Sequence, residues 1–244
     1  MTAQHRAAIR RLAVAGCALA AAFAGLVAWV MVHPAHTPAL DLTLHAAAVR
    51  HRTPSGVTVA RAITNSAEGF AFAVAALGGV LALRPRQWWL AAAVGAAALG
   101  LGQLVRLGLS VAIARPRPPA ADWATAAGGY ALPSGHTTTA TLAAGLLCIG
   151  LARSLREPWR IVGMGIAACW AIAVGSTRVY LGVHWPTDVL GGWMLGALLS
   201  VLAAALLLVG LDRGGSAGRV DQRDQLQRSD DGHRRDPGQG DVGP

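Results

Sequence analysis

Long apolar stretches separated by short polar ones fill the chain as far as residue 211. Six apolar segments can be drawn, at residues 12–32, 67–83, 88–113, 137–152, 161–177 and 189–211. A helix rises about 1.5 Å per residue, so roughly 20 apolar residues cross the hydrocarbon core of a bilayer. The pattern therefore predicts an all-α integral membrane bundle of six transmembrane helices.

The polar segments divide this bundle. Residues 1–66 are expected to form an N-terminal transmembrane helix and an outer loop, and residues 67–211 a core of five transmembrane helices. Within the outer loop, the stretch "LDLTLHAAAVRHR" predicts a short interfacial helix. Residues 212–244 are rich in Gly, Asp and Arg and poor in apolar side chains, so we expect a disordered cytoplasmic tail.

The first apolar segment follows a basic N-terminus, which is also how a signal peptide begins. Its 12–32 stretch is longer than the roughly 7–15 residues of a signal peptide's apolar region. This length favours a retained membrane helix over a cleaved signal.

Arginines between the segments predict the orientation. If the segments alternate, one side of the membrane receives most of them, namely Arg6, Arg10, Arg11, Arg84, Arg86, Arg153, Arg156, Arg160, Arg213 and Arg219. The positive-inside rule makes this side cytoplasmic. Both termini are then cytoplasmic, in a multi-pass protein of the inner (plasma) membrane.

Composition supports a membrane protein and excludes other classes. Hydrophobic residues make up 54% of the chain and charged residues 14%, against about a quarter charged in soluble domains. The net charge of +9 does not form one patch and no nucleic-acid motif is present, so no nucleic-acid partner is expected. The three cysteines lie alone in apolar runs without disulfide or metal spacing. We expect no metal and no cofactor.

Chemically capable side chains gather on the outer face. The loops at residues 114–136 and 178–188 hold Arg115, Arg117, His136, Arg178, His184 and Asp188. These loops are distant in sequence but lie on the same side of the membrane. This convergence is the first indication of a site.

The stretch "LPSGHTT" predicts an anion site at a helix N-terminus. Ser134 suits the N-cap position, and Gly135 lets a ligand approach the backbone closely. Free N–H groups at this end bind anions, and His136 beside them can transfer a proton near neutral pH.

The stretch "GSTRVYLGVHWPTD" predicts an oriented histidine. His184 and Asp188 are four residues apart around the start of the last helix, where Pro186 fits the first turn. Asp188 can bind one ring nitrogen of His184 and leave the other free as a nucleophile. Arg178 precedes them and suits phosphate oxygens.

The stretch "ARPRPP" adds two more arginines. The prolines favour extended geometry for Arg115 and Arg117, so both side chains are expected on one side of the segment. With no acid beside them, their expected partner is a substrate phosphate.

Together these stretches resemble the signature of the type 2 phosphatidic acid phosphatase family, which is related to the vanadium haloperoxidases. That signature is K-x6-R-P, then P-S-G-H, then S-R-x5-H-x3-D. Here Arg117-Pro118, residues 133–136, and Arg178, His184 and Asp188 match it in order, over a region of about residues 67–211.

The resemblance implies a role for each matched residue. His184 would attack phosphorus and become a phosphohistidine, Asp188 would orient it, and His136 would protonate the leaving oxygen. The phosphate oxygens would be held by Arg117, Arg178, Ser134 and the Gly135 N–H.

The chain departs from the signature at the lysine, because it contains no lysine. Counting back from Arg117, the lysine position is occupied by Ser110, with Arg106 one helical turn earlier. We expect Arg106 or Arg115 to supply the missing charge.

The resemblance and the position of the site imply a membrane lipid phosphatase. Expected substrates are a polyprenyl diphosphate, phosphatidic acid or phosphatidylglycerol phosphate, set among membrane lipids. Alternatives are a lipid phosphotransferase, or a transporter or binding protein that uses the anion site without turnover. The His–Asp pair and second histidine argue against binding alone.

Overall fold

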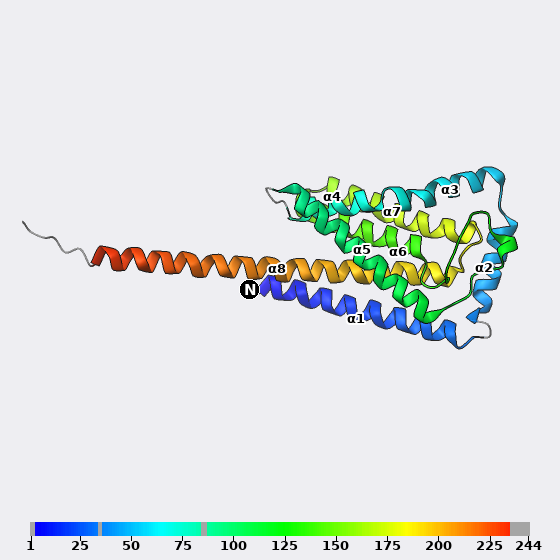
Figure 1. Ribbon diagram of the computed structural model, residues 1–244, viewed down its shortest axis with the longest axis horizontal. Helices are drawn as coiled ribbons and strands as arrows, with labels where there is room; N and C mark the ends of the chain where they lie inside the picture. The colour runs from blue at the N-terminus through cyan, green and yellow to red at the C-terminus, as the bar shows by residue number, and fades with distance from the viewer. Residues whose placement is uncertain (1–2, 34–35, 84–86, 235–244) are drawn as a thin grey trace, which may run out of the picture.

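The computed structural model describes residues 3–33, 36–83 and 87–234 (Figure 1). The elements are α1 (Ala3–Met31), α2 (Ala39–Arg50), α3 (Pro54–Gly69), α4 (Ala71–Leu83), α5 (Trp88–Ile113), the 3-10 turn η2 (Ala120–Asp122), α6 (Gly135–Ser154), α7 (Trp159–Tyr180) and α8 (Pro186–Arg234). Within the described residues the regular elements are all helices and no strand is present, which confirms the all-α prediction.

The membrane spans agree with the apolar pattern with one difference. Helices α1, α5, α6, α7 and the first half of α8 are each long and apolar enough to cross a bilayer. Helices α3 and α4 form a sixth span only as a pair, bent by 50° at their junction. Residues 54–66 were expected in the outer loop, but they form most of α3. The prediction missed this helix because its residues are too polar to stand out as an apolar segment. The chain is a multi-pass membrane protein.

Helix α6 is the centre of the bundle. It packs against α4, α5, α7 and α8, and half of its most apolar 18-residue stretch is buried inside the protein. Glycines of α8 allow this close approach: a Cβ atom at Gly192 or Gly196 would lie under 3 Å from side-chain carbons of Thr137 or Thr141. Helix α1 packs against α8 at the edge of the bundle (Figure 1).

Helix α8 is longer than the sequence analysis expected. It continues as one helix to Arg234, whereas disorder was expected from residue 212. The first proline after Pro186 is Pro237, so no proline interrupts this stretch. Residues 235–244 lie outside the described residues. The same holds for Arg84 and Arg86, two of the arginines that predict the orientation.

Local sequence signals bring the predicted site loops to one end of the bundle. Helix α5 ends where Ala114 adopts a left-handed conformation just before the prolines, and α6 begins directly after Ser134. Helix α8 begins with Pro186. These helix ends and the C-terminal end of α7 lie together, beside α2 (Figure 1). Helix α2 corresponds to the predicted interfacial helix.

Candidate active site

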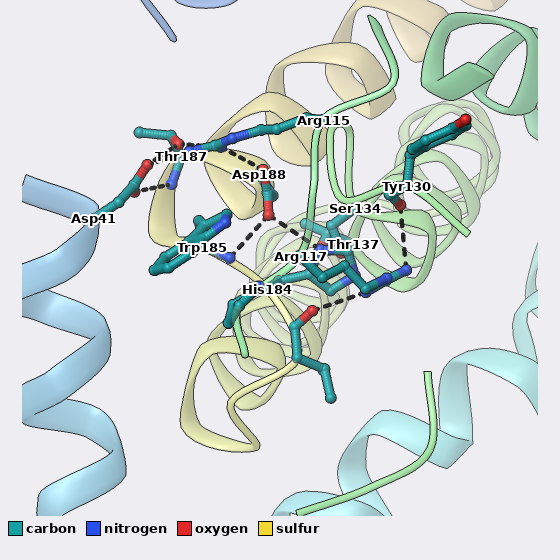
Figure 2. A network of polar contacts seen from close by, with 12 residues as sticks. Asp41, Arg115, Arg117, Tyr130, Ser134, Thr137, His184, Trp185, Thr187 and Asp188 are labelled. Carbon is teal, nitrogen blue, oxygen red and sulfur yellow. Dashed lines mark hydrogen bonds and ion pairs between the residues drawn. The ribbon is translucent and has the colours of Figure 1, made fainter. Parts of the chain in front are cut away.

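His184 and Asp188 form a buried pair at the start of α8 (Figure 2). The Nδ1 atom of His184 lies 3.3 Å from Oδ2 of Asp188, and the backbone N–H of Trp185 donates to the same oxygen at 2.8 Å. Both side chains are almost completely buried. Because the carboxylate accepts, Nδ1 carries the ring proton and Nε2 keeps its lone pair.

Arg117 faces this lone pair. Its Nη1 lies 2.9 Å from Nε2 of His184 and donates to the carbonyl oxygen of Val183 at 2.8 Å. Its other nitrogens donate to the carbonyls of Gly128, Gly129 and Tyr130. A guanidinium has donors only, so the contact requires Nε2 to accept, in agreement with the tautomer set by the Asp188 carboxylate.

Burial and neighbouring cations keep the imidazole neutral. Burial lowers the pKa of His184 well below its usual range, and nearby positive groups lower it further, in decreasing order Arg117, Arg178, His136 and Arg106. Burial likewise lowers the pKa of Arg117. At neutral pH the Nε2 atom of His184 is therefore unprotonated and keeps its lone pair.

The segment 132–138, which ends in the first turn of α6, is hydrogen-bonded to the same pair. The backbone N–H of Ser134 donates to the carbonyl oxygen of Asp188 at 3.0 Å, and its hydroxyl accepts from Thr137 at 2.9 Å. Ser134 is the residue before α6, as predicted, although its hydroxyl makes no capping bond. A Cβ atom at Gly135 would lie under 3 Å from the guanidinium of Arg106, so this side chain of α5 lies directly against the first residue of α6. The Arg106 guanidinium thus lies at the N-terminal end of α6, where the sequence predicts an anion site.

Arg178 reaches the site from the last turn of α7. It is 3% exposed, and its Nη1 donates to the Thr64 hydroxyl of α3 at 3.0 Å. Its Nε is buried without an acceptor among the described residues. An unpaired buried donor costs about 1–3 kcal/mol, so this nitrogen is suited to an incoming anion.

His136 pairs with an acid that the sequence analysis missed. Its Nε2 lies 2.7 Å from Oε1 of Glu68, near the bend between α3 and α4. Both line a cavity of about 380 Å³, whose walls also include Gln103, Arg106, Gly135, Phe72, Leu104 and Leu107. The cavity combines polar groups with an apolar wall, as an amphiphilic ligand requires.

Arg115 does not lie where the sequence analysis placed it. Its side chain is fully buried and donates to Asp188 Oδ1 at 2.5 Å, Thr187 Oγ1 at 2.7 Å, Asp41 Oδ2 at 2.6 Å and the His36 carbonyl at 2.9 Å. The phosphate-binding role predicted for it is corrected to an internal one, because its donors are already taken by protein acceptors. Two of these acceptors are acids more than 70 residues away in sequence, which local inspection could not find.

Asp41 was the other residue that the sequence analysis missed. The signal for it was weak: it is the one acid between residues 33 and 66, within a predicted interfacial helix. Among the described residues, no three His, Cys, Asp or Glu side chains lie together in a way that could hold a metal ion.

Comparisons with known proteins identify the family and similar structures. The family model described as the PAP2 superfamily matches residues 88–209, half of the chain. The crystal structure of a transmembrane PAP2 type phosphatidylglycerolphosphate phosphatase from Bacillus subtilis is similar, with a TM-score of 0.67 and 28% sequence identity. The similarity covers 82% of this chain and 96% of that one.

Similarity to curated sequences is more local. An undecaprenyl-diphosphatase from Sulfolobus acidocaldarius is 38% identical over 77 residues, which are 32% of this chain and 34% of the relative. Phosphatidylglycerophosphatase B from Bacillus subtilis is 41% identical over 76 residues, 30% of this chain and 37% of the relative. The chain thus spans about a third of the length of these curated relatives.

Proposed function

The chain belongs to the PAP2 superfamily, and from this premise we propose that it is a membrane lipid phosphatase acting through a phosphohistidine at His184. The observation that carries the proposal is the environment of this imidazole. Its Nδ1 is bound to Asp188, while its Nε2 faces the cation of Arg117. A neutral nucleophile surrounded by positive charge suits attack on a phosphate.

The first step transfers the phosphoryl group to the enzyme. A phosphate oxygen replaces Nε2 as the acceptor of Arg117, which frees the lone pair to attack phosphorus. The bond from phosphorus to the oxygen of the leaving group, which is a lipid alcohol or a lipid monophosphate, breaks, and His136 donates a proton to that oxygen. Arg178, Arg106 and the N-terminal amides of α6, including that of Gly135, stabilise the phosphate charge.

The second step returns the enzyme to its starting state. His136, now neutral, takes a proton from a water molecule as this water attacks the phosphohistidine. The bond from phosphorus to Nε2 breaks, and inorganic phosphate leaves with the imidazole of His184 neutral again. Every proton and bonding pair is accounted for by these two histidines and water, and the arginines supply positive charge, so we propose a mechanism without a metal.

The substrate class follows from the cavity beside His136. Its polar groups suit a phosphate, and the side chains of Phe72, Leu104 and Leu107 suit an apolar chain. We therefore propose a lipid monophosphate or diphosphate, such as phosphatidic acid, phosphatidylglycerol phosphate or a polyprenyl diphosphate. The names of the relatives, an undecaprenyl-diphosphatase and phosphatidylglycerophosphatases, support the same class.

The deciding experiment measures phosphate release by purified wild type and His184→Ala. The panel comprises phosphatidic acid, phosphatidylglycerol phosphate and farnesyl diphosphate in detergent, each with and without EDTA. Release by wild type alone supports the proposal, and equal release by His184→Ala would refute the nucleophile. Loss of activity in EDTA would refute the metal-free mechanism. Labelled phosphate bound to wild type but not to His184→Ala after rapid quenching would identify the phosphohistidine.

We also propose that the site lies on the outer face of the plasma membrane, with cytoplasmic termini. The support is the concentration of arginines at the opposite ends of the helices. Tyr130 is 44% exposed near the site, and Glu157 is exposed at the other end. A membrane-impermeant thiol reagent should label Tyr130→Cys in intact cells, and Glu157→Cys only after permeabilisation. The reverse pattern would invert the topology.

A further inference from the structure

Asp41 belongs to α2, outside the 88–209 region that the family model matches. It nevertheless contacts Arg115 and Thr187, beside the His184–Asp188 pair. Its carboxylate is fully buried. Oδ2 accepts from Nη2 of Arg115 and from the Thr187 hydroxyl, both at 2.6 Å, and Oδ1 accepts from the Thr187 backbone N–H at 2.9 Å. A carboxyl group that only accepts hydrogen bonds, one of them from a guanidinium, is ionised.

Arg115 connects this carboxylate to Asp188. Its Nη1 donates to Oδ1 of Asp188 at 2.5 Å, and Oδ2 of Asp188 faces Nδ1 of His184 (Figure 2). The result is a buried row of alternating charge, from Asp41 through Arg115 and Asp188 to the imidazole of His184. Each member is oriented by hydrogen bonds to the next.

Asp41 also fixes the first turn of α8 in space. The Thr187 N–H is one of the amides that a helix leaves unpaired at its start, and Asp41 supplies its acceptor from another helix. The Thr187 hydroxyl accepts from Arg115 and donates to Asp41, which closes a ring around the turn that carries Asp188. Helix α2 therefore determines where the Asp188 carboxylate lies.

We propose that Asp41 is a positioning residue for the His184–Asp188 pair and that it acts through the charge and geometry of Arg115. This inference rests on the function proposed above, in which His184 becomes positively charged as it is phosphorylated. With Asp41 ionised, the buried row holds two negative groups against one guanidinium, and the surplus stabilises the cationic phosphoimidazole. Without it, Asp188 is fully neutralised by Arg115 and supports that cation less.

The charges around the imidazole define the expected sign. On its Nδ1 side His184 faces Asp188, which is bonded to Arg115 and through it to Asp41. The positive groups that act on the imidazole from other sides are Arg106, Arg117, His136 and Arg178. Removing the negative charge at Asp41 lowers the proton affinity of both members of the pair. The acid limb of kcat/KM, where activity is lost as the pair takes up a proton, therefore moves to lower pH.

The test compares four proteins in detergent at a series of pH values: wild type, Asp41→Asn, Asp41→Glu and Asp122→Asn. Dioctanoyl phosphatidic acid and farnesyl diphosphate serve as substrates. Asp41→Asn should lower kcat on the order of tenfold and shift the acid limb by about half a pH unit or more to lower pH. Asp41→Glu restores the charge and should return the limb to the wild-type position.

Asp122→Asn is the matched control. Asp122 also holds α2 to the outer loops, through a contact of 3.1 Å between its carboxylate and Nε2 of His45, but it does not touch Arg115. If Asp41 merely docks α2, Asp122→Asn behaves like Asp41→Asn, and the inference is overturned. It is also overturned if both Asp41 variants shift the limb equally, or if neither changes kcat or the limb.

Two further measurements keep the result decisive. If Asp41→Asn does not fold, Asp41→Glu alone should keep the wild-type acid limb with kcat lowered several-fold, and a shifted limb or unchanged kcat would overturn the inference. His184→Ala is assayed in parallel. An inactive wild type, or an active His184→Ala, refutes the proposed phosphatase instead of the role of Asp41.

Discussion

The two sides of the His184 imidazole are built differently. On the Nδ1 side, Asp188, Arg115 and Asp41 are fully buried, and each of these three charges has an opposite partner within 2.6 Å. On the Nε2 side, the guanidinium of Arg117 is held by backbone carbonyls and a ring nitrogen, and an Nε of Arg178 has no acceptor among the described residues. Charges paired within the protein set geometry, whereas positive charges without acidic partners are available to bind a ligand.

Arg115 and Arg117 express this difference within one short segment. They are two residues apart, each before a proline, and their local sequence predicts equivalent roles. Arg115 is fully buried against two acids, while Arg117 is partly exposed and bonded to neutral acceptors. Their substitution should therefore affect different properties.

The largest expected effect is on folding, from Arg115→Met. It leaves the carboxylates of Asp41 and Asp188 buried without their cation, which costs about 3–5 kcal/mol of the free energy of unfolding. Thermal unfolding in detergent measures the loss, and activity should disappear with it. Arg117→Met is the matched control and should unfold close to the wild-type temperature. Equal destabilisation by the two substitutions would contradict the comparison.

Asp188→Asn should leave the fold largely intact and nearly abolish catalysis. Arg115 keeps Asp41 as a partner, but the amide favours the wrong ring tautomer of His184 and cannot support its positive charge. By analogy with the carboxylate of a catalytic triad, kcat should fall about 10³- to 10⁴-fold. Single-turnover phosphate release measures this, and a loss below tenfold would argue against Asp188 as the orienting group.

Arg117→Gln tests the positive side. Loss of a phosphate donor in a buried site should lower kcat/KM about 10²- to 10³-fold. Removing this cation also raises the pKa of His184, because Arg117 is the strongest of the positive groups that lower it. Since the protonated imidazole cannot attack, the acid limb moves to higher pH, opposite to Asp41→Asn. A pH profile shifted the same way in both variants would contradict the distinction between the two sides.

Sequence spacing was sufficient to place the groups that share the site. The helix starts at Gly135 and Pro186 and the end of α5 before the prolines were all indicated by local signals. Because helices across a membrane alternate, these ends had to meet on one face. The convergence of His136, Arg178 and His184 therefore needed only the apolar pattern and the helix caps.

The paired acids could not be found in this way. Asp41 and Glu68 come from segments outside the three motifs, and their contacts depend on how α2 and α3 pack against the bundle. The same packing determines the partners of Arg115. The alternation of side chains along an extended segment predicts on which side Arg115 lies, but it does not predict which residues Arg115 contacts. Tertiary contacts of single polar residues leave no periodic trace in a sequence.

Arg106→Ala tests which residue supplies the charge that Ser110 does not. Arg106 lies at the start of α6, against Gly135, whereas Arg115 is engaged elsewhere. We expect kcat/KM to fall about tenfold or more, since a phosphate donor is lost. Ser110→Lys added to Arg106→Ala should recover part of the activity. An unchanged kcat/KM in Arg106→Ala would remove this residue from the site.

Glu68→Gln should have the smallest effect, and that effect should depend on the leaving group. The Glu68 side chain is 69% exposed and contacts His136, so in the proposed mechanism it acts in the step that protonates the leaving oxygen. A carboxylate supports a protonated imidazole better than an amide does. General acid catalysis matters most for a poor leaving group, so kcat for phosphatidic acid, which releases an alcohol, should fall by about three- to tenfold.

The same substitution should barely change kcat for farnesyl diphosphate, whose leaving phosphate needs little protonation. Glu157→Gln is the control: it removes an acid that pairs with Arg160 at the opposite end of the bundle, and both rates should stay at the wild-type value. Equal losses on the two substrates would instead place Glu68 in binding or in support of the fold. The dependence on the leaving group thus distinguishes Glu68, which contacts His136, from Asp188 and Asp41, which lie on the His184 side.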